Sequence, residues 1–204
     1  GERRLNPSTP LTSVMLLVER GELRLSDPVA KYLPAFAVEG KESITVQDLL
    51  THVSGMLADN AIADYQQGHE EAMRRICALK PLAPVGQRFI YSDVNFILLG
   101  EIVNKVSGQN LHEFSHSQLF EPLGMKDTGF LPNAELRRRA APTEQRDGRW
   151  MQGEVHDPRA FKLGGVAGHA GLFSTASDLA IYAQSMLDGG RGGGKSVLAQ
   201  PTIA

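Results

Sequence analysis

The sequence predicts a mostly α-helical chain, and three observations lead to this fold class. Apolar residues recur at intervals of three and four in several segments, which is the spacing of one buried helix face. Capping residues, glycines and prolines bracket these segments. Segments with a two-residue apolar period, the pattern of a strand, are scarce in the 204 residues. We therefore expect about six or more helices and little sheet.

The first half of the chain predicts short helices separated by turns. From Ser8, a cap candidate and a proline in the first turn open a helix that ends at Gly21. Residues 14–18 of this helix are all apolar, which places it in the middle of the protein. Further helix starts are predicted at residues 27–28 and, through a capping box, at residues 45–48, where a short helix runs to His52.

Residues 91–108, YSDVNFILLGEIVNKVSG, are the stretch around which we expect the chain to be organised. Its apolar residues have helical spacing, Ser92 can cap the first turn, and Gly108 can close the last. A polar cluster stands at the helix start, formed by Tyr91, Ser92, Asp93 and Asn95. Free amides and the positive end of the helix dipole make this a favourable place for a reacting oxygen or an anion.

Four further helices are predicted on either side of this stretch. They cover residues 70–79, 111–120, 134–139 and 175–187. The last of them begins with a capping box formed by Thr175 and Asp178. Beyond Gly189 the chain is rich in glycine, and we expect it to be mobile.

The composition is that of a soluble globular domain. Hydrophobic residues make up 42% of the chain and its formal net charge is −2, so there is no basic excess for nucleic acid. The run at residues 137–139 is interpreted as a solvated face. No apolar run approaches the roughly 20 residues of a membrane span, and no signal peptide opens the chain. The compartment and the oligomeric state stay open.

The single cysteine, Cys77, is interpreted as a small buried hydrophobe, because one cysteine cannot form an internal disulfide.

Two short motifs suggest other chemistry. His112, Glu113 and His116 match the H-E-x-x-H pattern of zinc proteases, with Glu135 as the natural third ligand. A zinc hydrolase is therefore a remote alternative, and two surface histidines are the simpler interpretation. Residues 189–196, GGRGGGKS, match a phosphate-binding loop. A helix precedes this pattern where a buried strand is required, so we interpret it as a flexible glycine linker.

Tyr91-Ser92-Asp93 resembles the Tyr-x-Asn motif of the penicillin-recognising serine hydrolases. This family includes class C β-lactamases, D-amino-acid peptidases and related esterases. Four further blocks resemble the family in the same order, namely LSDPVAKYLP (25–34), ITVQDLLTHVSG (44–55), LFEPLGMKDTGF (119–130) and GHAGLFSTASDLA (168–180). The resemblance covers roughly residues 13–200.

The resemblance implies both a fold and a chemistry. The fold would be the helical lobe of the α+β β-lactamase/DD-peptidase-like fold, with the main antiparallel sheet largely missing and residues 1–204 forming one partial domain. The chemistry would be acyl transfer through a serine, on a small ester, amide or peptide-like substrate, with no cofactor or metal. Tyr91 would shuttle protons and Asp93, an asparagine in the more usual motif, would orient it. Asn95 and His169 would contact substrate.

Two parts of the family's catalytic set are not found in the sequence. The spacing of the resemblance puts the S-x-x-K serine near Arg3 or Arg4 and its lysine near Asn6 or Pro7. Ser8 and Ser13 are followed three residues later by leucines, and no lysine precedes Lys31. His169-Ala170-Gly171 has the letters of the third motif, His-x-Gly, but is interpreted as a glycine turn beside the pocket.

We therefore expect a fragment that is inactive as given, with a non-catalytic binding module on the same scaffold as the alternative. We also expect the apolar helix at residues 14–18 and the sheet-facing helix sides to be partly bare, as an exposed apolar patch.

Overall fold

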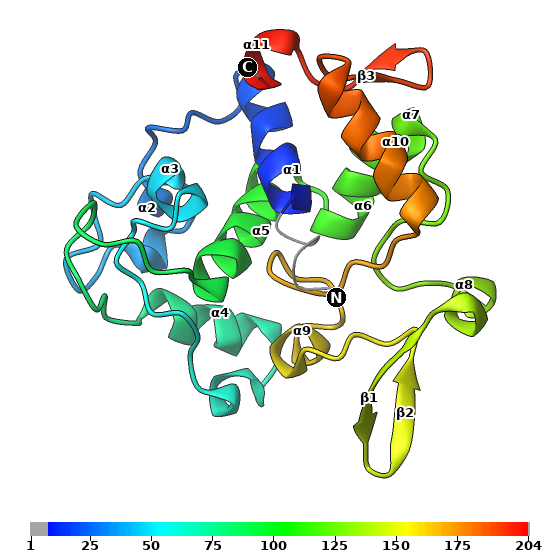
Figure 1. The fold of residues 1–204 in the computed structure, drawn as a ribbon. Helices are drawn as coiled ribbons and strands as arrows, with labels where there is room; N and C mark the ends of the chain where they lie inside the picture. The colour runs from blue at the N-terminus through cyan, green and yellow to red at the C-terminus, as the bar shows by residue number, and fades with distance from the viewer. Residues whose placement is uncertain (1–7, 204) are drawn as a thin grey trace.

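The computed structural model describes residues 8–203, and helices dominate that part of the chain (Figure 1). The helices and short 3-10 or π turns (η) are α1 (Ser8–Glu19), α2 (Val29–Tyr32), η2 (Pro34–Phe36), α3 (Val46–Leu50), η3 (Ile62–Tyr65), α4 (His69–Cys77), α5 (Asp93–Ser107), α6 (Leu111–Ser115), η4 (His116–Phe120), α7 (Glu121–Leu123), α8 (Ala134–Arg139), α9 (Pro158–Lys162), α10 (Ala176–Leu187) and α11 (Gln200–Ile203). None of these helices is long and apolar enough to cross a bilayer.

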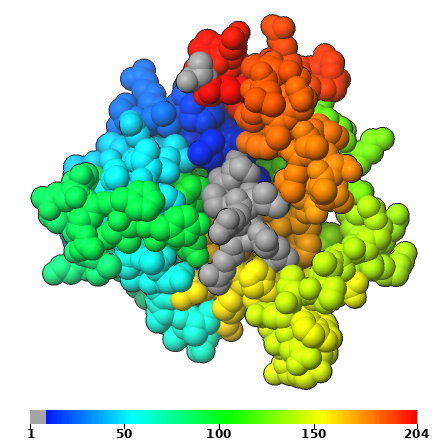
Figure 2. Space-filling model, viewed as in Figure 1, coloured from blue at the N-terminus to red at the C-terminus, as the bar shows by residue number. Residues whose placement is uncertain are grey.

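Within the described residues, the sheet consists of two antiparallel hairpins. One pairs β1 (Pro142–Arg146) with β2 (Arg149–Gln152), and the other pairs β3 (Arg191–Gly192) with β4 (Lys195–Ser196). The β1–β2 hairpin projects from the edge of the molecule, at the bottom of Figure 2. The prediction of a mostly helical chain with little sheet is confirmed.

Helices α1 and α5 pack against each other at the centre of the fold. The cap predicted for α5 is present, because the Ser92 hydroxyl accepts a hydrogen bond from the Asn95 amide at 3.2 Å. The predicted stop is also present, since Gly108 has a left-handed φ of 71°. Nine residues of α5 are buried, in keeping with its central place.

The expected bare apolar face of the first helix is wrong for its central residues. Val14 and Leu17 are fully buried and Leu16 is 4% exposed, because α5 and α6 pack against α1. Leu11, 42% exposed, is the large apolar residue of α1 that remains open. The apolar run therefore lies in the core of the described chain, as its all-round pattern predicts.

Polar contacts join α1 to the end of the chain. Thr12 and the Tyr182 hydroxyl of α10 share a hydrogen bond of 2.8 Å. The Glu19 carboxylate accepts hydrogen bonds from the Ala199 amide, at 2.7 Å, and from the Thr202 hydroxyl. These contacts hold the last described residues beside α1, where Figure 1 draws α11 next to the blue helix.

Two predicted segments differ from the structure. The helix expected over residues 111–120 is α only to Ser115, and then widens into the π turn η4. The linker expected over residues 189–196 is instead the β3–β4 hairpin, with Gly193 and Gly194 in left-handed conformations at its turn. The residues that follow Ser196 do not begin a helix until Gln200, so the geometry of a phosphate-binding loop is not present there.

Candidate functional site

Tyr91 lies immediately before the cap of α5, with 51% of its surface exposed. The backbone on both sides of it is fixed by hydrogen bonds. The Ile90 amide donates to the His52 carbonyl at 2.9 Å, and the Asp93 amide donates to the Ala58 carbonyl at 2.8 Å. The Ser92 hydroxyl donates to the Leu57 carbonyl at 2.7 Å. The tyrosine is thus presented to solvent at the positive end of the central helix.

Asp93 and Asn95 occupy different environments on the first turn of α5. Asp93 is partly exposed, whereas Asn95 is fully buried. The Asn95 side chain accepts a hydrogen bond from the Ser54 hydroxyl at 2.8 Å and donates to the Leu49 carbonyl at 3.2 Å. This position differs from the expected substrate contact, because both ends of the amide are used inside the protein. Asn95 instead holds residues 49–54 against α5.

His52, at the end of that held segment, is a residue of the site that sequence reasoning missed. Its ring centroid lies 4.6 Å from that of Tyr91 and 5.0 Å from that of Phe96. Its Nδ1 accepts a hydrogen bond from the Ser92 amide at 3.1 Å, so the neutral ring carries its proton on Nε2. Burial lowers the pKa of His52, which favours this neutral form.

His169 lies on the loop that packs against α5 through Gly168, and it is 3% exposed. Its Nε2 contacts the Asp157 carboxylate at 3.0 Å, and the same carboxylate oxygen accepts hydrogen bonds from the amides of Arg159 and Ala160. Its Nδ1 is buried and has no hydrogen-bond partner among residues 8–203. Burial acts to raise the pKa of Asp157, but the His169 contact and the two amides outweigh it and hold that pKa well below its usual range.

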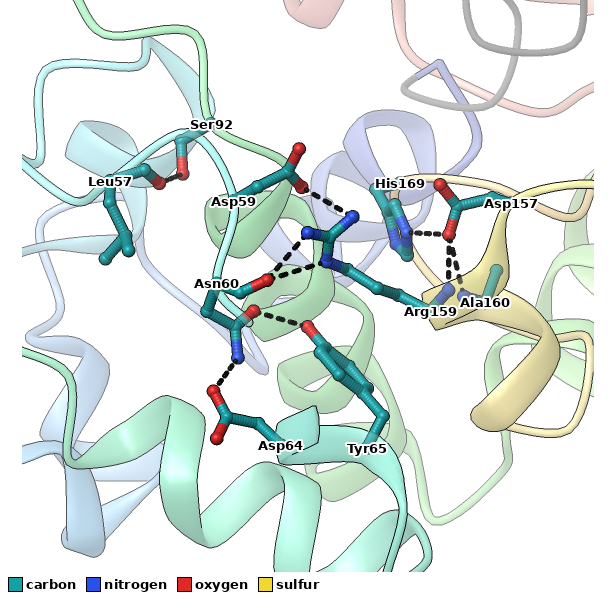
Figure 3. Close-up of polar contacts among 10 residues, drawn as sticks. All are labelled: Leu57, Asp59, Asn60, Asp64, Tyr65, Ser92, Asp157, Arg159, Ala160 and His169. Carbon is teal, nitrogen blue, oxygen red and sulfur yellow. Dashed lines mark hydrogen bonds and ion pairs between the residues drawn. The ribbon is translucent and has the colours of Figure 1, made fainter. Parts of the chain in front are cut away.

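Arg159 joins the surroundings of His169 to those of Tyr91 through residues 57–60 (Figure 3). Its guanidinium donates twice to the Asn60 carbonyl, at 3.0 and 2.6 Å, and lies 3.5 Å from the Asp59 carboxylate. The other end of this segment is held by Ser92 through Leu57. The structure therefore connects Tyr91 and Asp93, predicted from one block, and His169, predicted from another, to one hydrogen-bonded frame.

The zinc interpretation lacks a third ligand within residues 8–203. No group of three histidine, cysteine, aspartate or glutamate side chains there is placed to hold a metal ion, so Glu135 does not complete the set. The ring centroids of His112 and His116 are 6.4 Å apart, and the helix changes from α to π at His116. The turn between the two histidines is still α-helical, because the His116 amide donates to the His112 carbonyl, so what the described residues do not supply is a third ligand.

A cavity of about 940 Å³ lies apart from Tyr91, Asp93 and His169, none of which lines it. Its walls come from η4, the loop at 126–133, α8, β1 and residues 172–175. The size suits a small molecule, but the cavity does not contain the predicted catalytic groups.

Comparison with known proteins gives consistent results. Residues 11–204 match the family model described as Beta-lactamase. A protein of Escherichia coli (strain K12), provisionally named a D-alanyl-D-alanine carboxypeptidase, is 35% identical over 216 residues that cover 92% of this chain and 50% of that protein. The chain thus spans about half the length of this curated relative.

Two solved structures share the fold. A penicillin-binding protein homolog from Caulobacter crescentus superposes with a TM-score of 0.77 at 22% identity, covering 97% of this chain and 58% of that one. A class C beta-lactamase mutant gives a TM-score of 0.76 at 20% identity, covering 98% and 52%. The predicted helical lobe of an α+β fold is confirmed.

Proposed function

The chain belongs to the beta-lactamase family, and from this premise we propose that it carries the tyrosine-bearing part of an acyl-transfer site. The family is one of serine hydrolases. The reaction proposed is cleavage of an ester, amide or β-lactam through an acyl-serine. The observation that carries the proposal is the placement of Tyr91, half-exposed and fixed on both sides, at the positive end of α5.

In the proposed mechanism Tyr91, as the phenolate, takes the proton of the attacking serine, and the phenol so formed returns that proton to the leaving group. Asp93, the first residue of α5 and partly exposed, orients the phenol. His169 is buried beside Asp157 and shapes the pocket wall. Asn95 supports the site from within the core and does not contact substrate.

The nucleophile is not assigned to a residue of the described chain. Ser13 is fully buried on α1, and the hydroxyls of Ser54 and Ser92 are occupied by Asn95 and Leu57. The positions near Arg3, Arg4, Asn6 and Pro7 lie outside the described residues. We propose that the protein in its natural length supplies the serine and its lysine, and that residues 1–204 without them do not turn over substrate.

The name of the Escherichia coli relative favours one substrate class. We propose a peptide-like amide ending in a small D-amino acid, with simple esters as surrogate substrates.

The test is made on the natural protein that contains this sequence. Turnover is measured with a p-nitrophenyl ester, a chromogenic cephalosporin and a D-alanyl-D-alanine peptide, and acylation with a fluorescent penicillin. We expect Tyr91→Phe to lower kcat by about 100- to 10,000-fold, because it removes the proton carrier. The thermal midpoint should stay unchanged, since the side chain is half-exposed.

Tyr32→Phe is the matched control, because it deletes the hydroxyl of another tyrosine, at the end of α2, which donates to Asp27. Turnover by Tyr91→Phe equal to that of the unchanged protein would exclude Tyr91 from the mechanism. Peptide binding without acylation or hydrolysis by the natural protein would instead favour the non-catalytic binding module.

A further inference from the structure

His52 makes three separate contacts with the three consecutive residues centred on Tyr91. Its backbone carbonyl accepts the Ile90 amide at 2.9 Å. Its Nδ1 accepts the Ser92 amide at 3.1 Å. Its ring stacks on the Tyr91 ring, with centroids 4.6 Å apart and planes inclined by 34°. One residue therefore determines where both flanks of the tyrosine and the face of its ring lie.

The backbone of His52 is unusual for a residue with a side chain. Its φ of 59° is left-handed. It follows the C-cap Thr51 of α3, and the Val53 amide returns to the Asp48 carbonyl at 3.0 Å while the His52 amide returns to Leu49 at 3.3 Å. This is the helix-ending motif in which glycine is the usual residue at the position of His52, because a Cβ there is strained. A histidine in that place points to a role for its ring.

The surroundings of His52 make it a rigid support. It is 9% exposed, and its ring contacts the Phe96 ring of α5 at 5.0 Å and the edge of Phe89 at 5.6 Å. The buried Asn95 amide fixes the loop that carries it, through Ser54 and Leu49. A stacked ring that cannot move fixes its partner, whereas an exposed tyrosine alone would sample several rotamers.

We propose that His52 is a positioning residue for catalysis: it holds the Tyr91 phenol in the reactive geometry and does not itself touch substrate. This inference rests on the proposed role of Tyr91. A displacement of about 1 Å in a reacting group costs about 100-fold in rate, so the loss of the stack should appear in kcat. KM should change little, because the contacts with bound substrate are kept.

Two variants suit the left-handed backbone and therefore keep the fold. His52→Gly restores the usual residue of the motif, and His52→Asn adds a short polar side chain that this conformation tolerates. In the natural protein we expect each to lower kcat by about 10- to 100-fold per folded molecule. The matched control is His116→Asn on η4, an exposed histidine whose ring contact is with His112.

A double-mutant cycle separates positioning from general stability. If His52 acts through Tyr91, adding His52→Asn to Tyr91→Phe causes no further loss of kcat, because the group being positioned is already gone. A purely structural role would give additive losses that follow the thermal midpoint. In NMR spectra of this chain, the ring signals of Tyr91, identified by their loss in Tyr91→Phe, should shift when the His52 ring is removed.

Different results would overturn the proposed role of Tyr91 and the proposed role of His52. If Tyr91→Phe is inactive while both His52 variants keep kcat within twofold, the positioning role is overturned and the function of Tyr91 stands. If Tyr91→Phe keeps full activity, the proposed function fails, and the role of His52 fails with it. Unshifted Tyr91 ring signals in His52→Asn would also overturn the inference.

Discussion

At the residue scale, the buried Asp157 carboxylate is the group that holds the His169 ring in place. It is 2% exposed and accepts three hydrogen bonds, from His169 and from the amides of Arg159 and Ala160. These contacts hold its pKa below the value of about 3.9 that an unfolded chain shows. A lowered folded pKa stabilises the fold fully above the unfolded value, and that contribution is lost as the pH falls below it.

We therefore expect Asp157→Asn to lower the free energy of unfolding by about 1–3 kcal/mol near neutral pH. The difference from the unchanged chain should shrink as the pH falls from about 5 to about 2, because over this range the unfolded parent takes up a proton at Asp157 that the folded parent does not. Urea unfolding followed by circular dichroism at several pH values measures this. Asp147→Asn, in the exposed turn between β1 and β2, is the control. A difference that does not vary with pH would contradict the expectation.

The predicted site residues also show what a sequence can and cannot reveal at this scale. The cap pattern located Tyr91 and Ser92 at the start of α5, as the structure has them. The same pattern does not tell which of Asp93 and Asn95 faces substrate. Residues two apart on a helix point to different faces, so the two could not both lie on the substrate side. The stack of His52 on Tyr91 joins residues far apart in the sequence, and no local spacing encodes such a contact.

At the scale of elements, glycine packing fixes the His169 loop on α5. A Cβ at Gly168 would lie 1.8 Å from the Phe96 carbonyl oxygen, and one at Gly100 would lie 3.2 Å from the Gly168 nitrogen. Since Gly168 does not have a positive φ, its requirement is for space rather than for a special backbone conformation. The loop and the helix can approach this closely only without side chains at the contact.

Gly168→Ala should lower the free energy of unfolding by about 1–3 kcal/mol, because the loop must move away from α5. Gly129→Ala is the matched control: its φ is also not positive, and the nearest atom to its Cβ is 4.0 Å away. We expect that control to stay within about 0.5 kcal/mol. Chemical denaturation of both variants measures the difference, and equal stability of the two would show that the loop does not pack as described.

The accuracy of the element predictions follows from the kind of signal each one used. Caps and stops depend on local hydrogen bonds, so the box at Thr45 and Asp48 and the stop at Gly108 are found as predicted. Apolar period does not distinguish an α turn from a π turn, which is why η4 was missed. Glycine content does not distinguish a mobile linker from a packed hairpin: a Cβ at Gly190 would lie 2.0 Å from the Leu198 carbonyl oxygen.

At the scale of the whole molecule, the described chain is built around the packed pair α1 and α5. The buried apolar residues form one cluster that includes Val14, Leu16 and Leu17 of this helix. The sequence predicted the central place of α1 from its all-round apolar run, but it could not show that α5 and α6 cover that run. Which faces are covered depends on how the helices cross, and this is set by tertiary packing.

The central role of α1 can be tested with one pair of leucines. Leu17 is fully buried in the shared core, whereas Leu187, at the end of α10, is 81% exposed. Leu17→Ala should lower the free energy of unfolding of the chain by about 2–5 kcal/mol, because it removes buried methyl groups and leaves a cavity. Leu187→Ala makes the same chemical change in solvent and should stay within about 0.5 kcal/mol. Urea unfolding is followed by the circular dichroism of the helices. If the two variants lose stability equally, α1 is not anchored in the core, and the rigid platform on which α5 presents Tyr91 would have to come from contacts beyond those described.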